Sequence, residues 1–319
     1  MSIWDVFQYN AVVFYGVVAF LSLFVGSFLN VVIHRLPIMM ENAWRQGLAE
    51  WDEAQAEAQP AANSVEDDID ADISSVSVNA DALTHSSASA TEPFNLAVPR
   101  SRCPKCGTLI TAWQNIPVLS WLLLRGKCHQ CKTPISARYP LVELSTMLLS
   151  LVVAWHLGPT PQAVLGIVVT WFFVTMSMID FDHQLLPDSL TLPLMWLALI
   201  ASLFPVFTDV RSAVIGAAAG YLVLWSVFHV FRLITGKEGM GYGDFKLLAA
   251  IGALLGWQSL PVVILLSSLV GAVVGITVIA ITGRDKNIPI PFGPFLAAAG
   301  WIAMLWGDTL TDQYLGLFA

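Results

Sequence analysis

Long apolar runs with at most one charged residue recur along this chain of 319 residues and limit what it can fold into. A helix needs roughly 20 mostly apolar residues to cross a bilayer, and about 17 at the low end. One run, Leu247–Gly283, is long enough for two helices that turn at Trp257–Pro261. The sequence therefore predicts an all-α polytopic membrane protein with about eight transmembrane helices. The other six expected helices are Ala11–Ile33, Leu141–Leu157, Ala163–Ile179, Leu190–Phe207, Ala213–Phe231 and Ile288–Trp306.

The composition supports this class, because only 12% of the residues are charged and the mean hydropathy is +0.69. Soluble domains carry about 25% charged residues. The net charge of −8 comes from residues 41–92, which hold 12 of the 23 acids. That stretch has few large apolar residues, so we expect disorder from about Gln55 to Thr91, with a short helix at Trp44–Ala58. No basic stripe with interleaved aromatic residues is present, which argues against nucleic-acid binding.

The basic residues predict the orientation of the chain. With eight helices, 14 of the 15 Lys and Arg residues fall in loops on one side, and only Arg211 falls on the other. Cytoplasmic loops carry this excess, so we expect that side to be cytoplasmic and both termini to be periplasmic. The first run has no basic residue before it and is too long for a signal peptide, so we expect it to remain as a helix.

All four cysteines lie in the first cytoplasmic loop, as two Cys-x-x-Cys pairs separated by 21 residues. This spacing is typical of a zinc ribbon, and four thiolates form a closed site for a structural zinc ion. An iron site, a redox-active pair or plain buried thiols are the alternatives. We expect His129 and His183 to lie outside the ligand set, which is Cys103, Cys106, Cys128 and Cys131.

Two aspartates stand at the ends of apolar runs, where a carboxylate is costly and usually marks function. Asp180 closes the run Ala163–Ile179, and Asp244 precedes the run that begins at Leu247. If the two meet, they share a proton, so that one can activate water while the other binds a peptide carbonyl. Gly241 and Gly243 would let a substrate backbone approach Asp244.

Other charged groups have simpler interpretations. Asp188 is expected to cap the helix that follows it, and Asp182 to be a solvated acid or a neighbour of the site. Glu143 is expected to reach toward the membrane surface or to pair with Arg138. His229 is expected to be a satisfied interior histidine.

Seven segments together resemble the bacterial type IV prepilin peptidase / N-methyltransferase family, intramembrane aspartic peptidases with a Gly-x-Gly-Asp motif. The resemblance covers nearly the whole chain except residues 41–92, an acidic insert that the family pattern lacks. The segments are Gly26–Pro37, Pro99–Cys106, Asn115–Trp121, Arg125–Cys128, Ile135–Glu143, Ile179–Asp188 and Gly241–Lys246.

The resemblance implies that Asp180 and Asp244 are catalytic, that the four cysteines bind zinc, and that Gly126 is linked to methylation. It implies cleavage of type IV prepilins or type II secretion pseudopilins after a glycine at the cytoplasmic face of the inner membrane. The new N-terminal residue would then be methylated with S-adenosylmethionine. A member that cleaves without methylating is the main alternative; a proton-coupled transporter or a non-enzymatic assembly factor are the others.

These observations divide the chain into four expected regions. They are a first transmembrane helix (residues 1–36), an acidic and largely disordered insert (37–98), a four-cysteine zinc domain (99–140) and a seven-helix peptidase domain (141–319).

Overall fold

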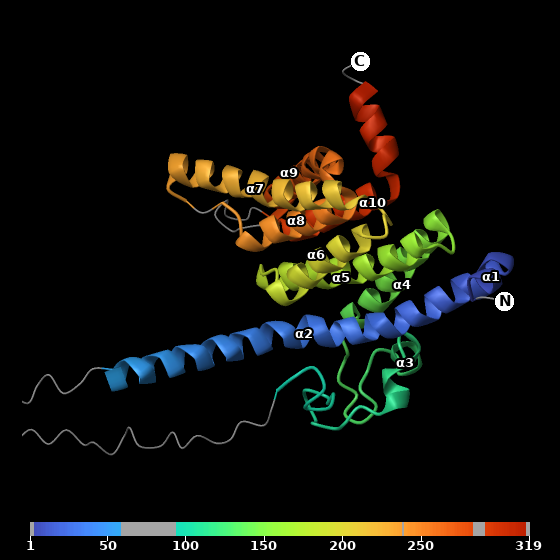
Figure 1. Ribbon diagram of the computed structural model, residues 1–319. Helices are drawn as coiled ribbons and strands as arrows, with labels where there is room; N and C mark the ends of the chain where they lie inside the picture. The colour runs from blue at the N-terminus through green and yellow to red at the C-terminus, as the bar shows by residue number, and fades with distance from the viewer. Residues whose placement is uncertain (1–2, 59–93, 238, 283–290, 317–319) are drawn as a thin grey trace, which may run out of the picture. The chain divides into compact units, whose positions relative to one another are not determined.

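The computed structural model describes residues 3–58, 94–237, 239–282 and 291–316. Most of these residues lie in helices, and within these ranges there is no strand. The only β-type pairing there consists of two isolated bridges, Arg102 with Leu109 and Lys127 with Pro134. In Figure 1 the helices are α1 (Ile3–Tyr9), α2 (Ala11–Ala58), α3 (Leu119–Leu123), α4 (Arg138–Leu157), α5 (Pro161–His183), α6 (Asp188–Ser202), α7 (Val210–Thr235), α8 (Tyr242–Leu255), α9 (Leu260–Thr282) and α10 (Gly293–Gly316), with the 3₁₀ turns η2 (Ala112–Asn115) and η3 (Trp257–Ser259).

Five of the described helices are long and apolar enough to cross a membrane, which confirms the helical membrane class. Two further apolar helices are shorter, Asp188–Ser202 and Gly293–Gly307. Helix α8 has only 14 residues. The expected total of eight transmembrane helices therefore stays a prediction. The expected turn near Trp257 is confirmed, because η3 lies between α8 and α9. The five segments long and apolar enough to cross a membrane are Ala11–Gln55, Arg138–Leu157, Pro161–His183, Val210–Thr235 and Trp257–Val278.

Some helix boundaries differ from those expected. Helix α6 ends at Ser202, five residues before the expected end at Phe207. Helix α2 continues to Ala58 with Pro37 inside it, so the short helix expected at Trp44–Ala58 is the end of α2. Its last turns are rich in Ala, Glu and Gln, which favour helix whatever their hydropathy. Most of the expected disorder, from Gln55 to Thr91, falls on residues outside those described, as does the start of the run at Ile288.

The chain divides into two compact units, Met1–His34 with Arg102–Ala319, and Arg35–Ser101. In the smaller unit, the buried Arg35 organises the loop that begins at Phe94. Its guanidinium donates hydrogen bonds to the carbonyl oxygens of Asn95 (2.9 Å), Leu96 (3.3 Å) and Pro99 (2.5 Å). It also lies 5.7 Å from the centre of the Phe94 ring.

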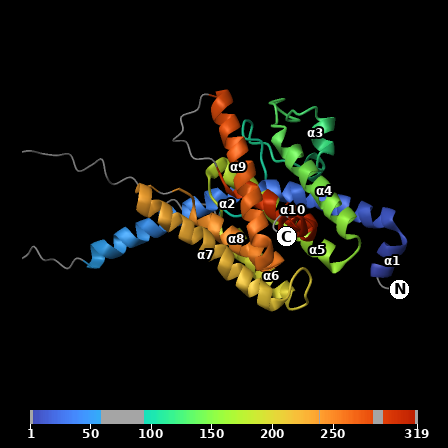
Figure 2. The ribbon, with the colours of Figure 1, turned by 90° about the horizontal axis from the view of Figure 1, so that it is seen from above.

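The larger unit is built around α8. Ten of its 14 residues are buried, and it packs against α6, α7 and α10. Figures 1 and 2 show α7 and α8 side by side. A Cβ atom on Gly216 would lie 2.1 Å from the carbonyl oxygen of Gly252, so the two backbones touch where side chains are absent.

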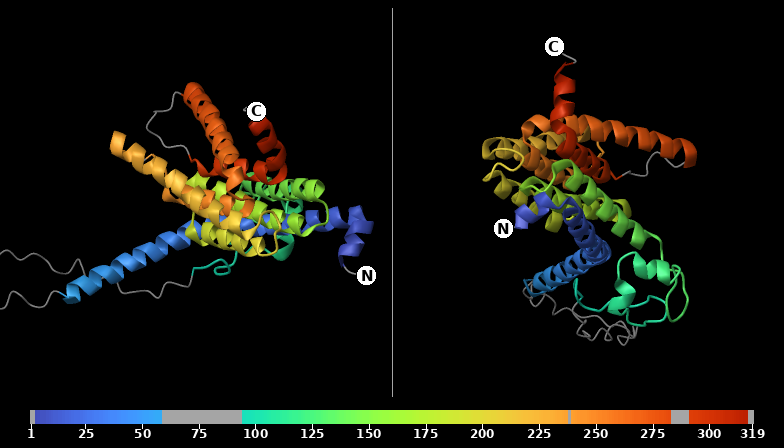
Figure 3. Two further views of the ribbon diagram at one scale, coloured as in Figure 1. Left: turned by 45° about the horizontal axis from the view of Figure 1, so that its top comes forward. Right: turned by 90° about the vertical axis from the view of Figure 1, so that its right-hand side faces the viewer.

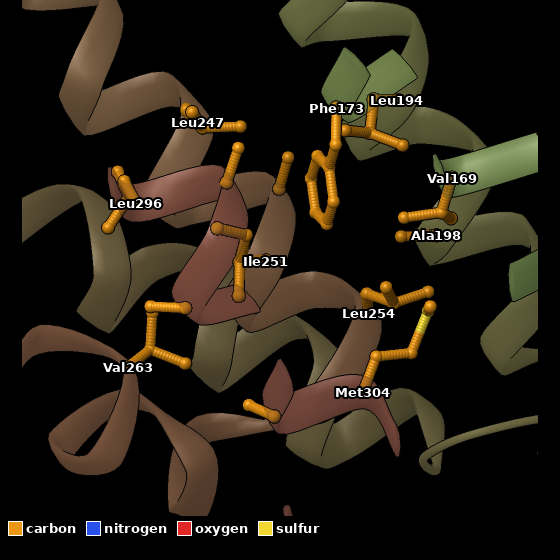
Figure 4. Packing of buried hydrophobic residues seen from close by; sticks show 14 of the residues in the cluster. Val169, Phe173, Leu194, Ala198, Leu247, Ile251, Leu254, Val263, Leu296 and Met304 are labelled. Atoms are coloured by element: carbon orange, nitrogen blue, oxygen red, sulfur yellow. The ribbon is translucent and has the colours of Figure 1, made fainter. Parts of the chain in front are cut away.

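The apolar core connects α8 to both sides of the bundle. Figure 4 shows Ile251 of α8 between Phe173 of α5 and Val263 of α9, and Leu254 of α8 beside Met304 of α10. Helix α9 extends away from the other helices in both views of Figure 3, and only 17% of its span is buried. The exposed surface of α9 is apolar, as expected for a helix in contact with lipid.

Candidate active site and four-cysteine module

Asp180 lies in the last turn of α5, and its side chain is buried. The backbone N–H of Gly293 donates a hydrogen bond of 3.0 Å to Oδ2 of Asp180. Gly293 is the first residue of α10, so this N–H is one that the helix cannot satisfy itself. A Cβ atom at position 293 would lie 2.6 Å from Oδ2, so a larger residue there would displace the carboxylate.

Asp244 lies in the first turn of α8 and is also buried. The side chain of Leu186 lies between the surroundings of Asp244 and those of Asp180. A Cβ atom on Gly243 would lie 2.6 Å from Cβ of Leu186, and one on Gly293 would lie 3.1 Å from Cδ1 of the same leucine. The structure thus brings both aspartates to the same end of the bundle, within electrostatic range of each other.

The two glycines before Asp244 have different surroundings. Gly243 is required by its contact with Leu186, so its smallness serves packing. A Cβ atom on Gly241 would meet nothing closer than 3.9 Å. Of the two positions expected to admit a substrate backbone, Gly241 is therefore the open one.

Two ion pairs flank the aspartates. Nζ of Lys246 donates to both carboxylate oxygens of Asp188, at 2.6 and 2.7 Å, and links α8 to the start of α6. The carboxylate of Asp182 binds both terminal nitrogens of Arg138, one of them at 2.8 Å, and links α5 to α4. The expectation that Asp188 caps α6 is wrong, because it is the first helical residue and its carboxylate binds Lys246.

Glu143 does not pair with Arg138, contrary to expectation. Its carboxylate is buried in the second turn of α4 and accepts a hydrogen bond of 2.7 Å from the N–H of Val118. Val118 itself has a positive φ (59°, with ψ −50°), which is unusual for a β-branched residue. Glu143 therefore attaches the loop before α3 to α4, and sequence reasoning missed this role because the partner is a backbone group.

The four cysteines form one cluster, with their Sγ atoms all within 4.8 Å of one another. The Sγ atoms of Cys103 and Cys131 are 3.8 Å apart. Zinc bound to sulfur at about 2.3 Å in a tetrahedron separates the sulfurs by about 3.8 Å, so the donor set fits this ion. Neither His129 nor His183 belongs to the cluster within the described residues, as expected.

The two cysteine pairs have the same local structure. The N–H of Cys103 donates to the carbonyl of Thr108 at 2.9 Å, and the N–H of Cys128 donates to that of Thr133 at 2.8 Å. The hydroxyl of Thr133, 3.2 Å from Sγ of Cys131, lowers the pKa of that thiol to about 6. A lowered pKa favours the thiolate, which is the form that binds metal.

Gly126 has a positive φ of 66° and packs beneath Trp121. A Cβ atom there would lie 2.9 Å from the indole ring. Its N–H donates to the carbonyl of Trp121 at 2.8 Å, and its carbonyl accepts from Ile135 at 2.7 Å. These contacts give Gly126 a packing role; its link with a methyl donor stays a prediction.

A helical membrane protein with two buried aspartates at one end of its bundle and a four-thiol module has the parts expected of an intramembrane aspartic peptidase. Family models match two parts of the chain: the bacterial peptidase A24 N-terminal domain at residues 20–157, and the type IV leader peptidase family at residues 167–276. The chain belongs to the type IV leader peptidase family.

Similar curated proteins carry the name prepilin leader peptidase/N-methyltransferase. The protein from Stutzerimonas stutzeri is 53% identical, over 92% of this chain and 91% of its own length. That from Aeromonas hydrophila is 52% identical over 96% and 95%, and that from Pseudomonas aeruginosa 52% over 92% and 91%. No solved structure matches the chain.

Proposed function

We propose that this protein cleaves the leader peptide of type IV prepilins or pseudopilins after a glycine, and then methylates the new N-terminal residue. Relatives about half identical over nearly the whole chain carry both activities in their names. The observation that carries the peptidase assignment is the pair of buried aspartates, Asp180 and Asp244, joined through Leu186 at one end of the bundle.

The environment of each aspartate favours a different role. Two buried carboxylates that repel each other share one proton. The N–H of Gly293 stabilises negative charge on Asp180, so Asp180 is the base that takes a proton from water. Asp244 then carries the shared proton and donates it to the carbonyl oxygen of the scissile peptide bond. The open side of Gly241 is where the substrate backbone approaches.

The four cysteines hold a structural zinc ion, and S-adenosylmethionine supplies the methyl group. The clustering of the four Sγ atoms within 4.8 Å of one another supports a metal with four sulfur ligands. A closed four-thiolate site leaves no open position, so zinc stabilises the module between Cys103 and Cys131 and takes no part in hydrolysis.

The protein lies in the bacterial inner membrane with Asp180, Asp244 and the cysteine module at the cytoplasmic face. The distribution of Lys and Arg supports this orientation, since 14 of 15 lie in loops on one side of the expected helices. Both aspartates lie at the ends of their helices on that same side.

One incubation tests the proposal. Detergent-solubilised protein is mixed with a prepilin and S-adenosylmethionine labelled in its methyl group. A smaller product that carries the label supports both activities. An unlabelled smaller product supports a peptidase alone, and an unchanged prepilin rejects the proposal.

A further inference from the structure

We propose that α3 and Trp113 insert into the interfacial layer of an anionic lipid bilayer and anchor the four-cysteine module there. Five large apolar side chains between Cys103 and Cys131 are exposed, and we refer to the four that belong to η2 and α3 as the α3 patch. A soluble surface rarely gathers such residues without a partner. The α3 patch consists of Trp113 (82% exposed), Leu119 (51%), Leu122 (58%) and Leu123 (74%).

The depth of α3 is fixed by contacts with two membrane helices. Glu143, which binds the N–H of Val118, is five residues beyond the start of α4, or about 7 Å along its axis. Gly26 of α2 lies beside Glu143, because a Cβ atom there would be 2.9 Å from Cα of Glu143. Gly26 is seven residues inside the apolar run that ends at Ile33, or about 10 Å.

Helix α3 starts at Leu119, directly after Val118, so its first residue lies at the level of these apolar segments. Figures 1 and 2 both show α3 beside the start of α4. Interfacial helices bury their apolar face by about 5–10 Å, which matches the level set by Glu143 and Gly26. The leucines of α3 therefore face acyl chains rather than water.

The charge of the module selects an anionic surface. Residues 99–140 contain seven Lys and Arg residues and no Asp or Glu. Arg125 and Lys127 lie two and four residues after the end of α3 and are exposed. Basic residues near an anionic bilayer are attracted to it electrostatically. The α3 patch with basic residues beside it fits an anionic lipid surface better than a folded protein partner.

A photoreactive benzophenone amino acid at Leu123 tests the contact. The full-length protein is placed in nanodiscs of phosphatidylglycerol or of phosphatidylcholine, with the same amino acid at the exposed Lys105 as the control. We expect mass spectrometry to find phospholipid adducts at position 123 and few at position 105, with a higher yield in phosphatidylglycerol. Equal yields at both positions, or none at position 123, would overturn the proposal, and equal yields in both lipids would overturn its electrostatic part.

A second measurement uses trypsin, which cuts after Arg125. Replacing Leu119, Leu122 and Leu123 by serine removes the apolar anchor, so we expect cleavage in phosphatidylglycerol nanodiscs to become about tenfold faster. An unchanged metal content shows that the module remains folded. If the triple variant loses its metal, the single change Leu123→Ser, at the most exposed leucine of the α3 patch, replaces it. Unchanged cleavage in a metal-loaded variant contradicts the proposal.

Discussion

The backbone N–H of Gly293 binds Oδ2 of Asp180 at 3.0 Å, across 113 residues of sequence. Both groups lie at helix ends, because Asp180 is in the last turn of α5 and Gly293 begins α10. The positive end of a helix dipole therefore points at this carboxylate. This contact stabilises negative charge on Asp180, which is the form that the proposed base requires.

Asp180→Asn and Asp244→Asn should each abolish cleavage of a prepilin, because a carboxamide can neither take nor share the proton. General acid–base catalysis by one group contributes about 10²–10⁴-fold, which is the loss expected in kcat. The measurement is gel-based cleavage at saturating substrate. Methylation of a peptide that already has a free N-terminus serves as the control and should persist. Full cleavage by either variant would reject the dyad.

Gly293→Ala should reduce cleavage strongly, because its Cβ atom would lie 2.6 Å from Oδ2 of Asp180 and push the two apart. Gly307→Ala in the same helix is the matched control, since a Cβ atom there meets nothing within 4 Å. The effect should appear mainly in kcat, because the change alters the carboxylate rather than the substrate contact. Equal activity of the two variants would show that the Gly293 contact is dispensable.

Much of this site could be predicted from local sequence. A charged residue at the end of an apolar run stands out against its neighbours, as Asp180 and Asp244 do. The cysteine pairs likewise have a spacing that a tetrahedral metal requires. Each of these residues stands out against its own neighbours in the chain, and the structure then gathers the four cysteines and brings both aspartates beside Leu186.

The remaining contacts depend on tertiary packing and leave no local pattern. The partner of Glu143 is a backbone N–H 25 residues away, and Asp188 meets Lys246 across 58 residues. Asp188 follows Pro187 at the start of a helix, so capping was the simplest local expectation. The length of α2 depends on a different property: beyond Pro37 the hydropathy falls, whereas the Ala, Glu and Gln residues of the last turns still favour helix.

The ion pair between Lys246 and Asp188 should position Asp244, because Lys246 lies two residues further along the same helix. Partly exposed pairs contribute only about 0–1 kcal/mol to stability, so Lys246→Met should hardly change the melting temperature. We expect a severalfold lower kcat with an unchanged KM. Arg45→Met, which breaks the exposed pair with Glu41, is the matched control and should leave cleavage unchanged. A purely structural pair would lower stability and leave kcat alone.

Replacing Cys128 by serine should remove the metal, because one of the four clustered thiols is lost. Elemental analysis should find about one zinc per chain in the parent protein and much less in the variant. Methylation should fall with the metal, whereas Asp180 and Asp244 remain in place for cleavage. A metal-free parent protein that methylates normally would contradict the assignment of the cluster.

Gly126→Ala should impair methylation more than Gly107→Ala does. Both glycines have a left-handed backbone, with φ of 66° and 68°, so alanine costs about 1–2 kcal/mol at either position. They differ in their surroundings, since a Cβ atom on Gly126 meets the Trp121 ring at 2.9 Å and one on Gly107 meets nothing within 4 Å. The difference between the variants therefore isolates the contact with Trp121, measured as methyl incorporation into a pre-cleaved peptide at equal metal content. Equal losses of methyl incorporation would mean that the backbone conformation, and not the contact with Trp121, accounts for the effect. Full activity of Gly126→Ala would show that methylation does not depend on this glycine.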